Sequence, residues 1–98
     1  MSTYFEKQPS PEEIKERMKG YTSWLEIDLD NIENNLNEIR EHTETTVMAV
    51  VKNNAYGHGL IPITAHLENL DVEWCMVAKL YEAQMIRRAG LKLNVLNM

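Results

Sequence analysis

The second half of the chain alternates between short apolar runs and stretches in which apolar side chains recur at helical spacing. From residue 46 onward this pattern predicts strand, helix, strand, helix, strand. The expected strands are 46–51, 73–78 and 93–96, and the expected helices are 60–70 and 80–89. The first two strand runs are continuously apolar, which is typical of parallel strands buried on both faces. Strands separated by helices form right-handed crossover units, so the pattern predicts an α/β fold with a parallel sheet.

The N-terminal part begins with a helix signal. Ser10 is a favourable cap and Pro11 a favourable first-turn residue, so we expect a short helix to about Met18 that stops at Gly20. We therefore divide the chain into an N-terminal extension with a short helix, residues 1–20, and the first strands and helices of a larger domain, residues 21–98.

A strand and a second helix are expected next. Residues 23–29 alternate apolar and polar side chains, as in a half-buried strand. Asp30 is expected to cap a helix that ends near His42. Apolar residues at spacings of four and three give this helix its buried stripe: Ile32, Leu36 and Ile39.

Composition and charge narrow the classes of function. The net charge of -5 argues against a nucleic-acid or anionic-membrane partner, since both require a basic surface. No segment approaches the roughly 20 apolar residues of a membrane span, and residues 1–20 contain no signal-like apolar stretch. The sequence therefore predicts a cytoplasmic protein. The single cysteine, Cys75, lies in an apolar run without a neighbouring base, which favours a buried thiol over a nucleophile.

Candidate chemistry gathers after the strand that ends near Val51. Lys52 follows this apolar run, and a loop at 53–59 leads to the next helix. Functional groups of parallel α/β folds collect where strands end, and a neutral lysine amine attacks aldehydes. From the residues alone, Lys52 is more typical of a surface lysine that ends a strand and extends into water. Gly57 and Gly59 could form a tight turn or allow a phosphate to approach.

The neighbouring side chains leave similar alternatives. Tyr56 could cover the core or donate its hydroxyl to an anion. His58 is more typical of a structural hydrogen-bonding residue than of a metal ligand, because His42 and His66 lie on separate expected helices. No metal site is therefore expected.

A wider pattern resembles a known family. The segment AVVKNNAYGHG, residues 49–59, resembles the cofactor-lysine signature of the alanine racemase family. Residues 24–36 resemble the family's opening strand and helix. A third set of residues resembles the end of the family's second strand and the helix that follows it. These residues are Ala78, Leu80, Glu82, Ala83, Arg87, Ala89 and Gly90. The sequence departs from the family at Asn53, where a small residue is more common, and in 93–98, which lacks an expected proline.

The resemblance implies a fold and a chemistry. The family folds as a (β/α)8 TIM-type barrel joined to a mostly β domain, and a barrel needs about 250 residues. This chain would therefore form only the N-terminal portion of the barrel. The lysine matching Lys52 holds pyridoxal 5′-phosphate as a Schiff base and acts as acid and base on one face of the substrate Cα. The tyrosine matching Tyr56 binds the cofactor phosphate.

The family also implies an assembly. It works as a homodimer on alanine, and the second base is a tyrosine from the partner subunit, beyond the residues of this chain. We therefore expect the 98-residue chain to be inactive alone. Two alternatives stay open: a serine or broad-specificity amino-acid racemase of the same family, and a non-catalytic fragment that associates with another chain.

Overall fold

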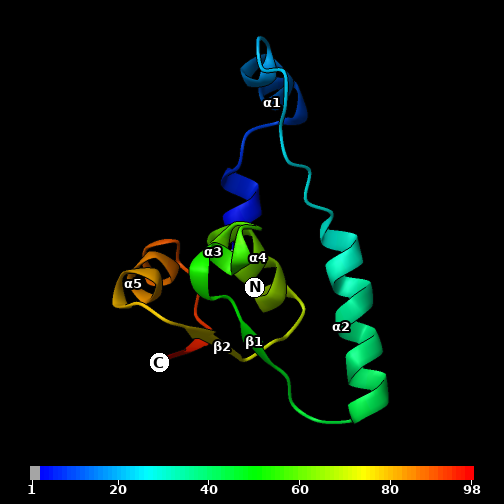
Figure 1. Cartoon of the computed structure of the whole chain (residues 1–98), viewed down its shortest axis with the longest axis vertical. Coiled ribbons are helices and arrows are strands. Elements are labelled where there is room, and N and C mark those ends of the chain that lie inside the picture. Colours follow the sequence, from blue (N-terminus) through cyan, green and yellow to red (C-terminus); the bar gives the residue numbers. More distant parts are fainter. Residues whose placement is uncertain (1–2) are drawn as a thin grey trace.

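A computed structural model describes residues 3–98, whose helices and strands are shown in Figure 1. The N-terminal part holds a 3-10 helix, η1 (Tyr4–Lys7), and two α-helices, α1 (Pro11–Met18) and α2 (Leu29–Thr43). The remaining elements are β1 (Met48–Val50), α3 (Lys52–Tyr56), α4 (Leu60–Asn69), β2 (Trp74–Val77), α5 (Leu80–Arg88) and β3 (Asn94–Asn97). The expected strands and helices after residue 46 are confirmed, with ends that differ by at most two residues.

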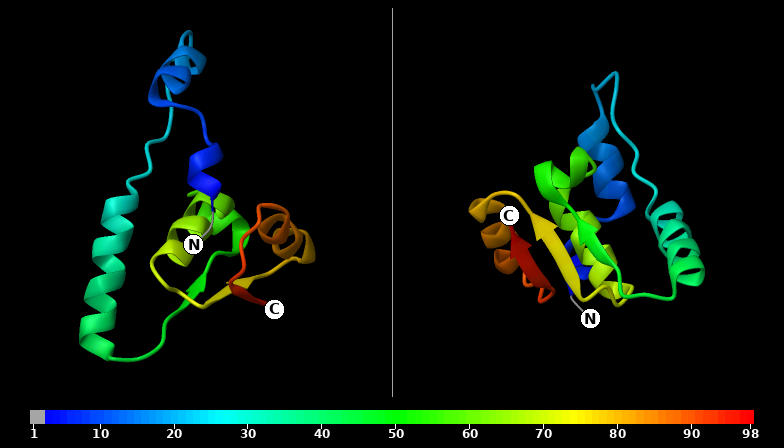
Figure 2. Two further views of the ribbon diagram at one scale, coloured as in Figure 1. Left: turned by 180° about the vertical axis from the view of Figure 1, so that it is seen from behind. Right: turned by 60° about the horizontal axis from the view of Figure 1, so that its bottom comes forward.

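The strands form one parallel sheet in the order β1-β2-β3. Met48 pairs with Trp74, and Trp74 pairs with Asn94, while Val50 pairs with Met76. The right-hand view of Figure 2 shows the strands side by side, with α4 and α5 behind them. Because all strands run in the same direction, their carboxyl ends share one edge of the sheet.

The core lies between one face of this sheet and the helices. Val51, Cys75 and Val77 are at most 2% exposed. The helices and the segments beside them supply most of the remaining core: Ile63, Ala65, Leu67, Val72, Ile86, Leu91 and Leu93. Alternate strand residues lie on the other face, where Val50 and Leu96 are each 42% exposed. The expectation of strands buried on both faces is therefore wrong for these residues, because helices cover only one face.

The N-terminal extension contacts the rest of the chain through η1. The Phe5 ring packs edge-on against the His66 ring of α4, with a centroid distance of 6.4 Å. Helix α1 buries no residue, and Figure 1 shows it projecting away from the sheet. The Ser10 hydroxyl accepts a hydrogen bond from the Glu13 N–H at 3.2 Å, which confirms the expected cap.

The alternating segment before α2 is not a strand. Residues 23–28 are irregular, and Leu25 is 84% exposed. A strand needs a neighbour to satisfy its backbone groups, and the sheet of the described residues contains only β1, β2 and β3. Asp28 rather than Asp30 caps the helix, because its Oδ1 accepts from the Asp30 and Asn31 N–H groups at 2.9 and 3.3 Å.

A helix can cross a membrane only if it is long and apolar enough. Helix α2 has the greatest length of the described helices, 15 residues, and only Leu36 of it is buried. None of the helices within residues 3–98 combines the length and apolar character needed to cross a bilayer.

Candidate functional site

Lys52 lies at the carboxyl-terminal edge of the sheet, as expected. It follows β1 after one residue, Val51, which is 2% exposed and whose N–H donates to the Met76 carbonyl at 2.9 Å. This bond continues the β1–β2 pairing up to the residue before the lysine. Lys52 itself is half-buried. A paired strand therefore fixes the backbone from which the Lys52 amine extends.

The residues after Lys52 form a left-handed helical turn instead of the loop expected at 53–59. Asn53, Asn54, Ala55 and Tyr56 all have φ between 52° and 57°, and Gly57 follows with φ 91°. Left-handed backbone costs roughly 1–2 kcal/mol for each residue with a side chain, and asparagine tolerates it better than most. The turn therefore needs support from its surroundings.

Hydrogen bonds within the segment supply part of this support. The Ala55 N–H donates to the Val51 carbonyl at 2.8 Å, and the Gly59 N–H donates to the Asn54 carbonyl at 3.0 Å. The Asn54 side chain contributes through its Oδ1, which accepts from the Leu60 N–H at 2.8 Å. Ala55 and Leu60 are 6% and 2% exposed. The turn is thus anchored in the core on both sides.

A buried carboxylate also contacts the turn. Glu82 of α5 is 1% exposed, and its Oε2 accepts from the Asn54 N–H at 3.1 Å. Its Oε1 accepts from the Ala78 N–H, just after β2, at 3.4 Å. Sequence reasoning gave Glu82 no role, since a glutamate in the first turn of a helix ordinarily lies in solvent. Only the three-dimensional packing of α5 against the Lys52 segment reveals this contact.

Tyr56 ends the left-handed turn, four residues after Lys52. It is 58% exposed, so its ring lies on the surface and not over the core. The turn therefore brings a primary amine and a phenol to the same edge of the sheet. An amine of this kind can bond covalently to an aldehyde, and a phenol hydroxyl can donate to an anion. These are the two residues that could hold an aldehyde-bearing, phosphorylated cofactor.

The histidines make local hydrogen bonds. His58 Nδ1 lies 3.1 Å from the Ala55 carbonyl, and His42 Nδ1 lies 2.8 Å from the Glu38 carbonyl. His66 Nε2 lies 3.0 Å from the Leu29 carbonyl and so joins α4 to α2. In residues 3–98, no three His, Cys, Asp or Glu side chains gather in a way that could hold a metal ion.

Cys75 lies inside the core, as the sequence predicted. It is 0% exposed in the middle of β2. Burial raises the pKa of its thiol from 9.0 to about 11, and the nearby Arg87 charge lowers the pKa by a smaller amount. The thiolate is the nucleophilic form, so this cysteine is a packing residue and not a reactive one.

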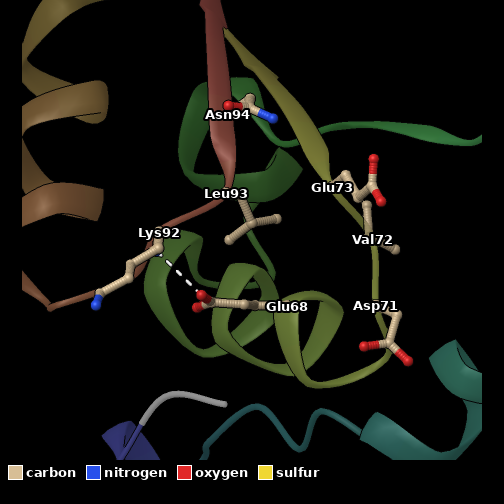
Figure 3. Close-up of a pocket in the computed structure, with 7 residues that line it drawn as sticks. All are labelled: Glu68, Asp71, Val72, Glu73, Lys92, Leu93 and Asn94. Carbon is tan, nitrogen blue, oxygen red and sulfur yellow. Dashed lines mark hydrogen bonds between the residues drawn. The ribbon is translucent and has the colours of Figure 1, made fainter.

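A surface hollow lies at the opposite edge of the sheet from Lys52. Figure 3 shows its lining at the start of β2 and β3: Glu68, Asp71, Val72, Glu73, Lys92, Leu93 and Asn94. Glu68 Oε1 accepts from the Lys92 N–H at 3.0 Å across this hollow. Because parallel strands end at the other edge, the hollow is remote from Lys52 and Tyr56.

Comparisons with known proteins agree with this arrangement. Residues 27–98 match the family model described as "Alanine racemase, N-terminal domain". The chain is 44% identical over 75 residues to an alanine racemase of Desulforamulus reducens, which covers 74% of this chain and 20% of the relative. It is 41% identical over 81 residues to an alanine racemase of Methanococcus maripaludis. The aligned region covers 81% of this chain and 22% of that relative.

A solved structure shares the fold. The crystal structure of alanine racemase from Bacillus anthracis with bound L-Ala-P has a TM-score of 0.71 and 40% identity. The match covers 76% of this chain and 20% of that one. The expected α/β fold, the opening part of a (β/α)8 barrel with parallel strands, is thereby confirmed. The chain spans about a fifth of the length of these relatives.

Proposed function

Because the chain belongs to the family of alanine racemase N-terminal domains, we propose that it is the cofactor-lysine part of an enzyme that interconverts L-alanine and D-alanine. The observation that carries this proposal is the position of Lys52. It follows β1 after one residue, at the carboxyl edge of a parallel sheet, and directly precedes the turn that presents Tyr56. In α/β barrels, catalytic groups lie at this edge.

The residues present fit pyridoxal 5′-phosphate. Lys52 supplies a half-buried amine for the cofactor aldehyde, and exposed Tyr56 supplies a hydroxyl for its phosphate. Lys52 Nζ would hold the cofactor covalently through its aldehyde carbon, with loss of one water molecule. When bound, the cofactor supplies an electron sink for the pair left at the substrate Cα after its proton departs.

Lys52 would then move the proton on one face of the substrate. Its amine accepts the Cα proton or returns one to the same face, according to its protonation state. Racemisation also requires a proton donor and acceptor on the opposite face, which the family takes from the partner subunit. We therefore expect the 98-residue chain alone to lack racemase activity, and measurable alanine racemisation by the purified chain would contradict this.

The proposed role for the complete enzyme is supply of D-alanine for peptidoglycan, as a cytoplasmic homodimer. The acidic net charge of -5 supports the further proposal that neither nucleic acid nor an anionic membrane is a partner. Dimerisation supports the chemistry as well, since the opposite-face base would come from the second subunit.

An absorption spectrum with added pyridoxal 5′-phosphate tests the role of Lys52. We expect the wild-type chain to give a visible band, distinct from that of free cofactor, which persists on dilution and is absent in Lys52→Ala. Lys79→Ala is the matched control, because Lys79 directly precedes α5 at the same sheet edge and lies 5.7 Å from the Tyr81 ring. If wild type and Lys52→Ala both give the spectrum of free cofactor, the proposal is contradicted.

A broader substrate range is the second candidate function. The chain is 33% identical over 88 residues to a protein named "Amino-acid racemase" from Enterococcus faecalis, which covers 88% of this chain and 12% of that relative. This similarity supports the alternative of a serine or broad-specificity amino-acid racemase of the same family. A panel of L-amino acids on the complete enzyme decides between the candidates, since alanine-only turnover would exclude the broader one.

A further inference from the structure

Glu82 is a charged side chain in the core of the described chain. Only two polar or charged residues of that part are fully enclosed, Thr64 at 0% and Glu82 at 1% exposure. Burial of a carboxylate is unfavourable unless hydrogen bonds compensate for the lost water. The partners of Glu82 therefore indicate what keeps it in place.

Its two oxygens accept from backbone groups of two different segments. The Asn54 N–H reaches Oε2 at 3.1 Å and the Ala78 N–H reaches Oε1 at 3.4 Å. Asn54 lies in the left-handed turn after β1, and Ala78 follows β2 directly. The carboxylate thus joins the ends of two neighbouring strands on the edge where Lys52 lies.

A helix-capping role does not account for this geometry. Glu82 is the third residue of α5, whose cap is Lys79. In a capping box, the glutamate at this position accepts from the N–H of the cap residue itself. Here the carboxylate instead accepts from Ala78, before the cap, and from Asn54, which is 28 residues away in the chain. The carboxylate is therefore oriented toward the segment after Lys52, and it does not cap α5.

The turn that receives this bond needs outside support. Residues 53–56 are all left-handed, and hydrogen bonds to a charged acceptor are about twice as strong as neutral ones. Without Glu82, the Asn54 N–H would be left without this acceptor beside the core. Loss of Glu82 would therefore reduce the free energy that holds residues 53–56 in the left-handed region.

We propose that Glu82 is a positioning residue for Lys52, because it fixes the left-handed turn that directly follows Lys52 and presents the Tyr56 hydroxyl. This inference rests on the proposed function of Lys52 as the cofactor lysine. Glu82 does not touch the cofactor, and it acts through the Asn54 backbone. The Ala78 bond keeps the carboxylate itself in place.

The test compares wild type with Glu82→Gln and Glu82→Ala in two measurements. The first is the apparent Kd for pyridoxal 5′-phosphate, from the visible band. The second is the amide hydrogen-exchange rate of Asn54. Glutamine keeps the side-chain volume but loses one acceptor oxygen. We therefore expect Glu82→Gln to raise the Kd roughly tenfold and to speed Asn54 amide exchange roughly tenfold. Both effects should be larger for Glu82→Ala. Glu73→Gln is the matched control, since Glu73 is exposed at the opposite edge of the sheet.

The outcomes separate this inference from the proposed function. Weaker cofactor binding and faster Asn54 exchange in Glu82→Gln, with Glu73→Gln unchanged, support the positioning role. A lower Tm for Glu82→Gln with unchanged Kd and unchanged Asn54 exchange would overturn it, because Glu82 would then only stabilise the fold. A wild type without the visible band would overturn the proposed function. In that case, Asn54 exchange alone decides whether Glu82 holds the turn.

Discussion

At the scale of single residues, the site depends on backbone conformations that few side chains accept. Four consecutive residues, 53–56, have positive φ, and two of them are asparagines, which tolerate this region. The departure from the family at Asn53 is therefore compatible with the local backbone. The backbone conformation therefore constrains which residues the segment 53–56 accepts.

A β-branched residue at position 53 tests this constraint. We expect Asn53→Val to lower the free energy of unfolding by about 1–2 kcal/mol, because a branched side chain is strained at φ 54°. Asn53→Gly should change it by less than about 0.5 kcal/mol, since glycine accepts this region but gains freedom in the unfolded chain. Urea unfolding of both variants provides the measurement, and equal stabilities would refute the strain argument.

The Cys75 thiol gives a pH-dependent prediction. Its pKa is raised from 9.0 to about 11 by burial, so the folded protein keeps the proton longer than the unfolded chain. The associated stability is fully present below pH 9 and is lost as the pH rises through about 11. Cys75→Ala should lessen this decline in urea unfolding between about pH 8 and 11.

Reactivity of the same thiol offers a second check. At about pH 8, iodoacetamide should label Cys75 far more slowly in the folded chain than in urea, because the thiol is 0% exposed and protonated. Equal labelling rates in the two conditions would show that the core opens readily.

At the scale of elements, capping residues determine where the helices begin. Asp28 Oδ1 accepts from two N–H groups at the start of α2, whereas the sequence favoured Asp30 as the cap. The two positions are close in sequence and chemically identical, so local pattern could not separate them. The backbone angles of Asp28, φ -97° and ψ 104°, place it just outside the helix.

Substitution of the two aspartates distinguishes the assignments. We expect Asp28→Ala to lower the free energy of unfolding by about 1 kcal/mol through loss of the cap. Asp30→Ala should lower the free energy of unfolding by only about 0.3 kcal/mol, since that carboxylate merely interacts with the helix dipole. Thermal unfolding by circular dichroism measures both, and a larger effect at Asp30 would reverse the assignment.

Elements that depend on local pattern were predictable, whereas elements that depend on distant partners were not. Helices α4 and α5 and strand β2 follow from apolar spacing and from the residues that end them. The strand expected at 23–29 is absent because no neighbouring strand pairs with it among residues 3–98. Gly57, Gly59 and the two adjacent asparagines are local signals for the left-handed turn, but they do not fix its extent. The contact between Glu82 and Asn54 joins residues that no sequence pattern connects.

At the scale of the whole molecule, helices cover one face of the sheet in residues 3–98, and the other face is uncovered. Trp74 and Leu96 are 38% and 42% exposed on the uncovered face, and Trp24 and Leu25 are 54% and 84% exposed before α2. The chain also spans about a fifth of the relatives it matches. The exposed apolar residues are therefore expected to contribute little to the stability of this chain alone.

A pair of leucine substitutions measures this difference. Leu91→Ala should cost at least about 2 kcal/mol, because Leu91 is 1% exposed in the core. Leu25→Ala should change the free energy of unfolding by less than about 0.5 kcal/mol, because Leu25 is 84% exposed. A large loss for Leu25→Ala in urea unfolding would show that residues 23–28 pack in solution.

The left-handed turn has a consequence for the handedness of its building blocks. Backbone angles that are unfavourable for an L-residue are the mirror image of those of an ordinary right-handed helix, and are therefore favourable for a D-residue. A synthetic chain with D-alanine at exposed position 53 would relieve strain that the ribosomal product must carry. The proposed enzyme would thus follow its reactive lysine with a backbone turn better suited to the mirror-image amino acid that it makes.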